Sequence, residues 1–95
     1  MALYVSLLTW TRGPSVSRDW PRRVDAQAKL IESRGGRLRE SYVTLGRFDD
    51  VLIFEAPSDE VATGIILNIA EQGGYNSETM RAFSAEEADR ILRSY

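Results

Sequence analysis

The sequence contains no cysteine and no histidine among its 95 residues. Without cysteine, neither a disulfide nor a thiolate nucleophile is available. Without histidine, the chain lacks the most common general base near neutral pH, the most common ligand of transition metals and the usual proximal ligand of haem. Any chemistry therefore depends on carboxylates, hydroxyls, arginines and the single lysine, Lys29, and we predict neither a metal nor a cofactor.

Long apolar stretches are also absent, since no run approaches the roughly 20 residues that a membrane-spanning helix needs. The N-terminal ten residues have no basic leader and no small-residue cleavage site, and they are typical of a strand. A hydrophobic content of 43% and a charged content of 27% are ordinary for a soluble globular protein. We expect a single cytoplasmic domain over residues 1–95, with no membrane as partner.

Charge is unevenly distributed along the chain. Residues 1–47 carry nine basic and four acidic side chains, whereas residues 48–95 carry three basic and ten acidic ones. Solvated helix faces are the simpler interpretation, and the more specific one is that the acidic half of one subunit faces the basic half of another. Nucleic acid is not expected as a partner, because the net charge is −2 and basic residues do not alternate with aromatic ones.

The first half of the chain has the pattern strand, helix, strand. Residues 2–10 are rich in strand formers, and a polar connection follows over residues 11–20. Pro21 is placed where a helix begins, and Gly35-Gly36 is placed where the helical spacing of apolar residues ends. Residues 37–45 then alternate in hydrophobicity like a half-buried strand.

The second half repeats this order. Residues 50–56 are predicted as a strand, and Ser58 caps a helix that ends at Gly73-Gly74. Residues 75–83 form the fourth strand, and a capping box that opens at Ser84 predicts a short C-terminal helix. The resulting order, β-α-β-β-α-β-α, predicts an α+β protein with the ferredoxin-like split βαβ arrangement, in which two helices cover a four-stranded antiparallel sheet.

Two helices can cover only one face of such a sheet, yet the strands at residues 2–10 and 50–56 are apolar on both sides. A large bare apolar patch is unusual on a soluble monomer. The most economical cover is a second copy of the same face, related by a two-fold axis. We therefore predict a homodimer or higher homo-oligomer in which two sheets pair as a dimeric α+β barrel.

The face between the two sheets is expected to mix aromatic and polar groups. Its predicted members are Tyr4, Ser6, Trp10, Glu40, Tyr42, Thr44, Ser77, Thr79 and Arg81. Apolar walls with sparse donors suit a small-molecule pocket, although a wet dimer interface is enriched in the same residue types. Arg81 either pairs with a carboxylate such as Glu40 or holds an acidic ligand. The candidate ligand-binding residues are Tyr4, Trp10, Tyr42, Arg47 and Arg81.

A compact corner, Gly46-Arg47-Phe48-Asp49, separates two strands that should pair as a hairpin. Glycine suits a positive φ, aspartate can hydrogen-bond its own backbone, and phenylalanine can act as an apolar plug. The functional alternative has Arg47 bind an anion and Asp49 act as a general base, which requires burial to raise its pKa. Asp49 and Arg81 are therefore the weak catalytic candidates.

Four segments together resemble the GYD-domain family: YVSLLTWT, SRGGRLRESYVTLGRFD, VLIFEAPSDE and SETMRAFSAEE. The similarity covers nearly the whole chain in order, and it implies a ferredoxin-like fold of the dimeric α+β barrel kind. Gly46, Arg47 and Asp49 match the family signature, but Phe48 replaces its tyrosine, so a role for a phenolic proton cannot be transferred. Relatives by fold include cofactor-free monooxygenases, isomerases, haem enzymes and ligand-sensing domains, and fold alone does not select among them.

Three functional hypotheses remain open at this point. The first is a homodimeric barrel that binds a small organic ligand between or beside the two sheets. The second is a non-catalytic oligomerisation or regulatory module that has no ligand pocket. The third is a cofactor-independent monooxygenase or isomerase.

Overall fold

The structure is a computed structural model that describes residues 1–12 and 18–95. Along these residues the elements are β1 (Ala2–Trp10), α1 (Trp20–Ser33), β2 (Arg37–Val43), β3 (Asp50–Ala56), α2 (Asp59–Gly73), β4 (Tyr75–Ala82) and α3 (Ala85–Ser94). The predicted order of strands and helices is confirmed, and their bounds agree closely with the expected ones. Part of the predicted polar connection, residues 13–17, lies outside the described residues.

The ends of the helices follow from local sequence signals. Pro21 lies in the first turn of α1. Backbone N–H groups of the first turn make no hydrogen bond within the helix, so proline, which lacks this group, is tolerated there. The Ser58 side chain accepts a backbone N–H at the start of α2, and Gly74 closes that helix at a φ of 73°. In α3, Ser84 and Glu87 form the predicted capping box. Among the helices that the structure describes, none is long and apolar enough to cross a membrane.

The strands form one antiparallel sheet in the order β2-β3-β1-β4, with β3 and β1 in the centre. In β2 the register shifts between Leu38 and Glu40. Such a bulge reverses the alternation of faces along the strand. Ser41 therefore lies opposite Leu52, on the same face as Leu38, which lies opposite Phe54. The split βαβ topology with four antiparallel strands is the ferredoxin-like α+β fold that the sequence predicts.

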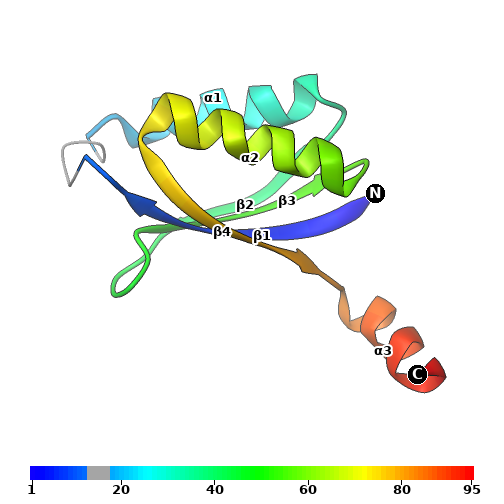
Figure 1. Cartoon of the computed structure of the whole chain (residues 1–95). Coiled ribbons are helices and arrows are strands. Elements are labelled where there is room, and N and C mark those ends of the chain that lie inside the picture. The colour runs from blue at the N-terminus through cyan, green and yellow to red at the C-terminus, as the bar shows by residue number, and fades with distance from the viewer. Residues whose placement is uncertain (13–17) are drawn as a thin grey trace.

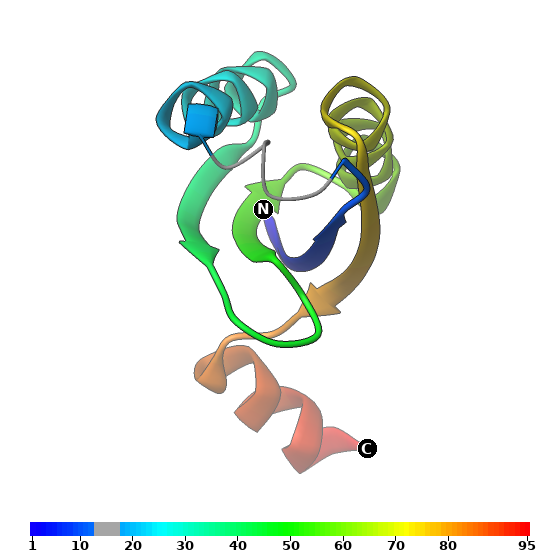
Figure 2. The ribbon, with the colours of Figure 1, turned by 90° about the vertical axis from the view of Figure 1, so that its left-hand side faces the viewer.

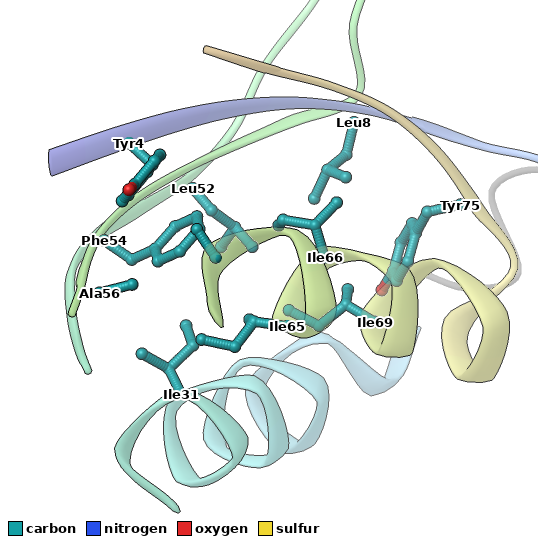
Figure 3. Close-up of a cluster of buried hydrophobic side chains, with 11 residues drawn as sticks. Tyr4, Leu8, Ile31, Leu52, Phe54, Ala56, Ile65, Ile66, Ile69 and Tyr75 are labelled. Atoms are coloured by element: carbon teal, nitrogen blue, oxygen red, sulfur yellow. The ribbon is translucent and has the colours of Figure 1, made fainter. Parts of the chain in front are cut away.

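α1 and α2 cover one face of the sheet and leave the other face open (Figure 1; Figure 2). The core between the helices and the sheet consists of Tyr4, Leu8, Ile31, Leu52, Phe54, Ala56, Ala62, Ile65, Ile66, Ile69 and Tyr75 (Figure 3). Within it, the rings of Tyr4 and Phe54 stack with their centroids 5.5 Å apart. Apolar side chains of the opposite parity on β1 and β3 consequently lie on the open face.

α3 is separate from this two-layer body. It follows β4 beyond the end of the sheet, on the side away from α1 and α2 (Figure 1; Figure 2). None of its residues, all of which are described, is buried, and Ile91 and Leu92 are 44% and 65% exposed. Two arginine–carboxylate ion pairs join successive turns of the helix. α3 thus has its own capping box and surface ion pairs, and it exposes an apolar stripe.

Candidate functional site

On β1 and β4 the two faces of the sheet carry different side chains from those predicted. The helix-covered face holds Tyr4, Ser6, Trp10, Ser77, Thr79 and Arg81. The prediction that these side chains lie between two sheets is therefore wrong. Glu40 and Tyr42 of β2 do lie on the open face, and Thr44 lies beyond the end of β2, in the connection to β3.

Pairing with β3 determines which side chains of β1 lie on the helix-covered face. Residues directly opposite each other in neighbouring strands share a face. Tyr4 lies opposite Phe54 and Ser6 lies opposite Leu52, and all four of these residues are buried beneath the helices. Since β1 is apolar on both parities, its own sequence does not indicate which side the helices cover.

A groove between α2 and β4, called here the α2–β4 groove, brings together two predicted ligand-binding residues, Tyr4 and Arg81. It has a volume of about 370 Å³, and Ile66 and Leu67 contribute apolar surface to it. The Tyr4 hydroxyl donates to Asp59 Oδ1 at 2.5 Å, and the Arg81 guanidinium lies 5.7 Å from the centre of the Tyr4 ring. Burial raises the pKa of Tyr4, and the hydrogen bond to Asp59 raises it further. Tyr4 thus acts as a donor that ties β1 to the start of α2.

Arg81 is not paired with Glu40, because β4 and β2 form opposite edges of the sheet. Its Nη1 donates to the backbone carbonyls of Leu3 and Ala82. Its guanidinium also lies 4.5 Å from the centre of the Phe83 ring. Arg81 is exposed, and over the described residues it forms no ion pair.

The corner at Gly46–Asp49 is the predicted hairpin turn between β2 and β3. The Thr44 backbone N–H donates to the carbonyl of Asp49 at 2.8 Å, and the Thr44 hydroxyl donates to the carbonyl of Phe48 at 2.7 Å. Gly46 has a φ of 102°, where a residue with a side chain would be strained. The sequence predicts that the Asp49 side chain holds the turn by a hydrogen bond to its own backbone, and this prediction is wrong. Asp49 Oδ2 instead accepts the backbone N–H of Trp10 at 2.7 Å.

The corner turns to the open side of the sheet (Figure 1), where it borders a hollow that we call the corner hollow. The hollow measures about 220 Å³. It is lined by Leu7 and Thr9 of β1, Asn76, Ser77 and Glu78 of β4, and Arg47 and Phe48 of the corner. The Arg47 guanidinium lies 5.5 Å from the centre of the Phe48 ring, and it forms no ion pair within the part of the chain that is described. An arginine, a carboxylate and apolar surface therefore meet on the open face.

Trp10 is partly buried and is held by two successive carboxylates. Its backbone N–H donates to Asp49, and its indole Nε1 donates to Asp50 Oδ2 at 2.6 Å. The indole ring also lies against Trp20, with 5.8 Å between ring centroids. The two acids contact different N–H groups and share no proton. Trp10 lines neither the α2–β4 groove nor the corner hollow.

Asp50 is a buried carboxyl that was not among the predicted site residues. It is fully buried, and its Oδ1 has no hydrogen-bond partner among the described residues. Burial raises the pKa of Asp50 to about 6, while the hydrogen bond from Trp10 acts in the opposite direction. The sequence did contain a signal, because Asp50 has the same parity as Leu52 and Phe54, and alternate residues of a strand share a face.

Tyr42 lies on the open face but borders neither cavity. It is 52% exposed, and its hydroxyl donates to Glu40 Oε2 at 3.1 Å, which raises the pKa of Tyr42. Across residues 1–12 and 18–95, no three acidic side chains gather where they could hold a metal ion. The predicted ligand-binding residues therefore separate into Tyr4 with Arg81 in the groove, Arg47 at the hollow, and Trp10 and Tyr42 elsewhere.

Comparison with known proteins gives one family match. A family model described as GYD domain matches residues 4–92, which is nearly the whole chain. No curated protein matches the sequence.

Several solved structures have a similar fold. The leucine response regulatory protein LrpA of Mycobacterium tuberculosis has a TM-score of 0.67 and 15% identity over 88% of this chain, which spans 51% of LrpA. A protein from Thermus thermophilus has a TM-score of 0.58 and 22% identity, with 90% of this chain and 96% of the other covered. The 30S ribosomal protein S6 of Thermotoga maritima has a TM-score of 0.57 and 16% identity, with 97% and 96% covered. At these identities the likeness concerns the fold alone.

Proposed function

Because this chain belongs to the GYD domain family, we propose that it forms a homodimeric α+β barrel that binds a small organic ligand between its two sheets. The observation on which this proposal rests is that the corner hollow opens on the uncovered face of the sheet. A second sheet packed on that face would turn the open hollow into an enclosed site.

The side chains of the open face support the proposal of a second copy. Leu3, Val5 and Leu7 of β1 and Val51 and Ile53 of β3 lie on this face, and all five are partly exposed. Burying apolar surface contributes about 25 cal/mol for each Å² removed from water. The same surface on a partner is the simplest cover, because a two-fold axis makes the contact self-complementary.

The lining of the corner hollow suggests the chemistry of the ligand. Arg47 provides an unpaired guanidinium that suits a carboxylate or another acidic group. Phe48 and Leu7 provide apolar contact, and Glu78 can accept a hydrogen bond from the ligand. A small organic acid with an apolar body and one donor group fits this combination.

Native mass spectrometry of the purified protein tests the proposal. We expect a mass of two chains plus a co-purified small molecule. In Arg47→Ala the dimer should persist, but the ligand should bind at least tenfold more weakly, since a hydrogen bond to a charged group is worth about 1.5–3 kcal/mol. Lys29→Ala, which removes an exposed charge from α1 on the far side of the sheet, is the matched control and should retain both dimer and ligand.

Two outcomes would contradict the proposal at different points. A monomer at micromolar concentration would rule out the paired sheets. A dimer whose crystal structure shows two tightly packed sheet faces, with no enclosed cavity of a few hundred Å³, would rule out the ligand and favour a module that only oligomerises.

A further inference from the structure

A third cavity lies on the helix side of the sheet, between α1 and the C-terminal end of α2, and it does not depend on the proposed dimer. Its volume is about 260 Å³. The walls that matter here are formed by Arg23, Ala26, Gln27 and Leu30 of α1, Ile69 of α2 and Tyr75 of β4. Arg22 lies at the same cavity as an exposed residue, where it forms an ion pair of 3.5 Å with Asp19.

Gln27 is the unusual residue of this wall. It is 5% exposed, yet its Oε1 has no hydrogen-bond partner among the described residues. A buried acceptor without a partner destabilises the folded state, and native proteins contain few of them. The terminal amide torsion of glutamine has a broad energy profile, so a small rotation can present this oxygen to the cavity.

Arg23 lies one helical turn before Gln27, on the same side of α1. Its Nη1 donates to the carbonyl of Gly73 at 3.2 Å and approaches the Tyr75 hydroxyl at 3.4 Å. These contacts fix the guanidinium, which lies 6.0 Å from the centre of the Tyr75 ring. Its Nε is buried and has no hydrogen-bond partner in the part of the chain that the structure describes. The Nε and Nη2 edge is the one that arginine uses to bind a carboxylate with two parallel hydrogen bonds.

We propose that the cavity between α1 and α2 is a binding site for a small carboxylic acid that has an N–H or O–H donor beside its carboxylate. The carboxylate binds Nε and Nη2 of Arg23, whereas Arg22 at the same cavity is paired with Asp19. The donor binds Gln27 Oε1. A short aliphatic body contacts Ala26, Leu30 and Ile69. This arrangement gives hydrogen-bond partners to the two buried polar atoms of the wall, Arg23 Nε and Gln27 Oε1.

Four small probes of similar size separate these contributions. Valine and 2-hydroxyisovalerate have both groups, isovalerate lacks the donor, and valinamide lacks the carboxylate. In NMR titrations of ¹⁵N-labelled protein we expect the first two to shift the side-chain amide signals of Gln27 and the backbone signals of α1 in a saturable way. Isovalerate and valinamide should bind at least tenfold more weakly. Saturation by none of the four would overturn the proposal and leave the cavity as a site for water.

Gln27→Met distinguishes a ligand contact from a structural role. Methionine has a similar length but no buried acceptor, so the thermal midpoint of the ligand-free protein should stay equal or rise. Binding of 2-hydroxyisovalerate should fall at least tenfold, to the level of isovalerate. Lys29→Met, on an exposed position of the same helix, is the control and should bind like the wild type. Unchanged binding in Gln27→Met, whatever its thermal midpoint, would contradict the assignment.

Discussion

The protonation of Asp50 couples the core of this protein to pH. Its pKa in the folded protein, about 6, lies above the ordinary value of 3.8. The folded state therefore takes up this proton at a higher pH than the unfolded state does, and the resulting stability is complete below about pH 3.8 and is lost as the pH rises through 6. Relative to Asp50→Asn, the wild type should lose about 1 kcal/mol of unfolding free energy between pH 5 and pH 7.5.

Urea denaturation of both proteins at the two pH values measures this difference. Asparagine retains an oxygen that can accept the indole N–H of Trp10, so the hydrogen bond is preserved while the charge is removed. Two unfolding free energies that change in parallel between pH 5 and pH 7.5 would show that Asp50 does not titrate in this range.

Individual side chains are also where prediction from the sequence was least successful. The sequence places Tyr4 and Trp10 on the open face through a choice of strand parity, and a shift of one residue exchanges the two faces. The pairing of Tyr4 with Phe54 places Tyr4 on the helix-covered face. This long-range contact cannot be predicted from the sequence of β1 alone. By contrast, the turn at Gly46 was predicted correctly, since its residue types act locally.

At the scale of elements, the order of helices and strands and most of their bounds could be predicted from the sequence. The helix starts at Pro21, Ser58 and Ser84 depend on interactions within one turn, which a local pattern can reveal. The bulge of β2 between Leu38 and Glu40 was not foreseen, because it arises from pairing with β3 and not from a local signal. The isolation of α3 was also not foreseen, since amphipathic periodicity does not say which surface a helix meets.

α3 gives a prediction about assembly. Its Ile91 and Leu92 side chains are exposed, so their removal should barely affect folding of the single chain. If a partner covers them, each buried side chain contributes about 1.5–3 kcal/mol to association. The double variant Ile91→Ser, Leu92→Ser should therefore weaken the proposed dimer at least tenfold while circular dichroism remains that of the wild type. Sedimentation over a range of concentrations measures the dimer affinity.

The matched control for α3 changes its polar side. Arg90→Ser removes one side of an exposed ion pair with Glu86, and such pairs contribute little to stability. It should leave the dimer affinity within about twofold, because a few tenths of a kcal/mol are involved. An equal loss in both variants would indicate that unfolding of α3, and not loss of its apolar contact, weakens the dimer.

At the scale of the whole molecule, charge separates across the sheet. α1 and β2 form one flank, and α2 and β4 form the other (Figure 2). Residues 18–43, which include α1 and β2, carry seven basic and four acidic side chains. Residues 59–84, which include α2 and β4, carry one basic and four acidic ones. The charge asymmetry of the sequence has thus become a difference between the two edges of one sheet.

This separation predicts how the proposed dimer responds to salt. A two-fold pairing that places the β2 edge of one copy over the β4 edge of its partner brings opposite charges together, and the attraction is screened beyond about 10 Å at 0.1 M salt. We expect the dissociation constant of the proposed dimer to rise several-fold between 0.05 and 0.5 M NaCl. The affinity that remains at high salt should come from apolar contacts of the open face. Sedimentation at the two salt concentrations measures this change. An affinity that increases with salt would mean that the two edges do not face each other and that apolar burial alone sets the arrangement, since screening cannot strengthen attraction between opposite charges.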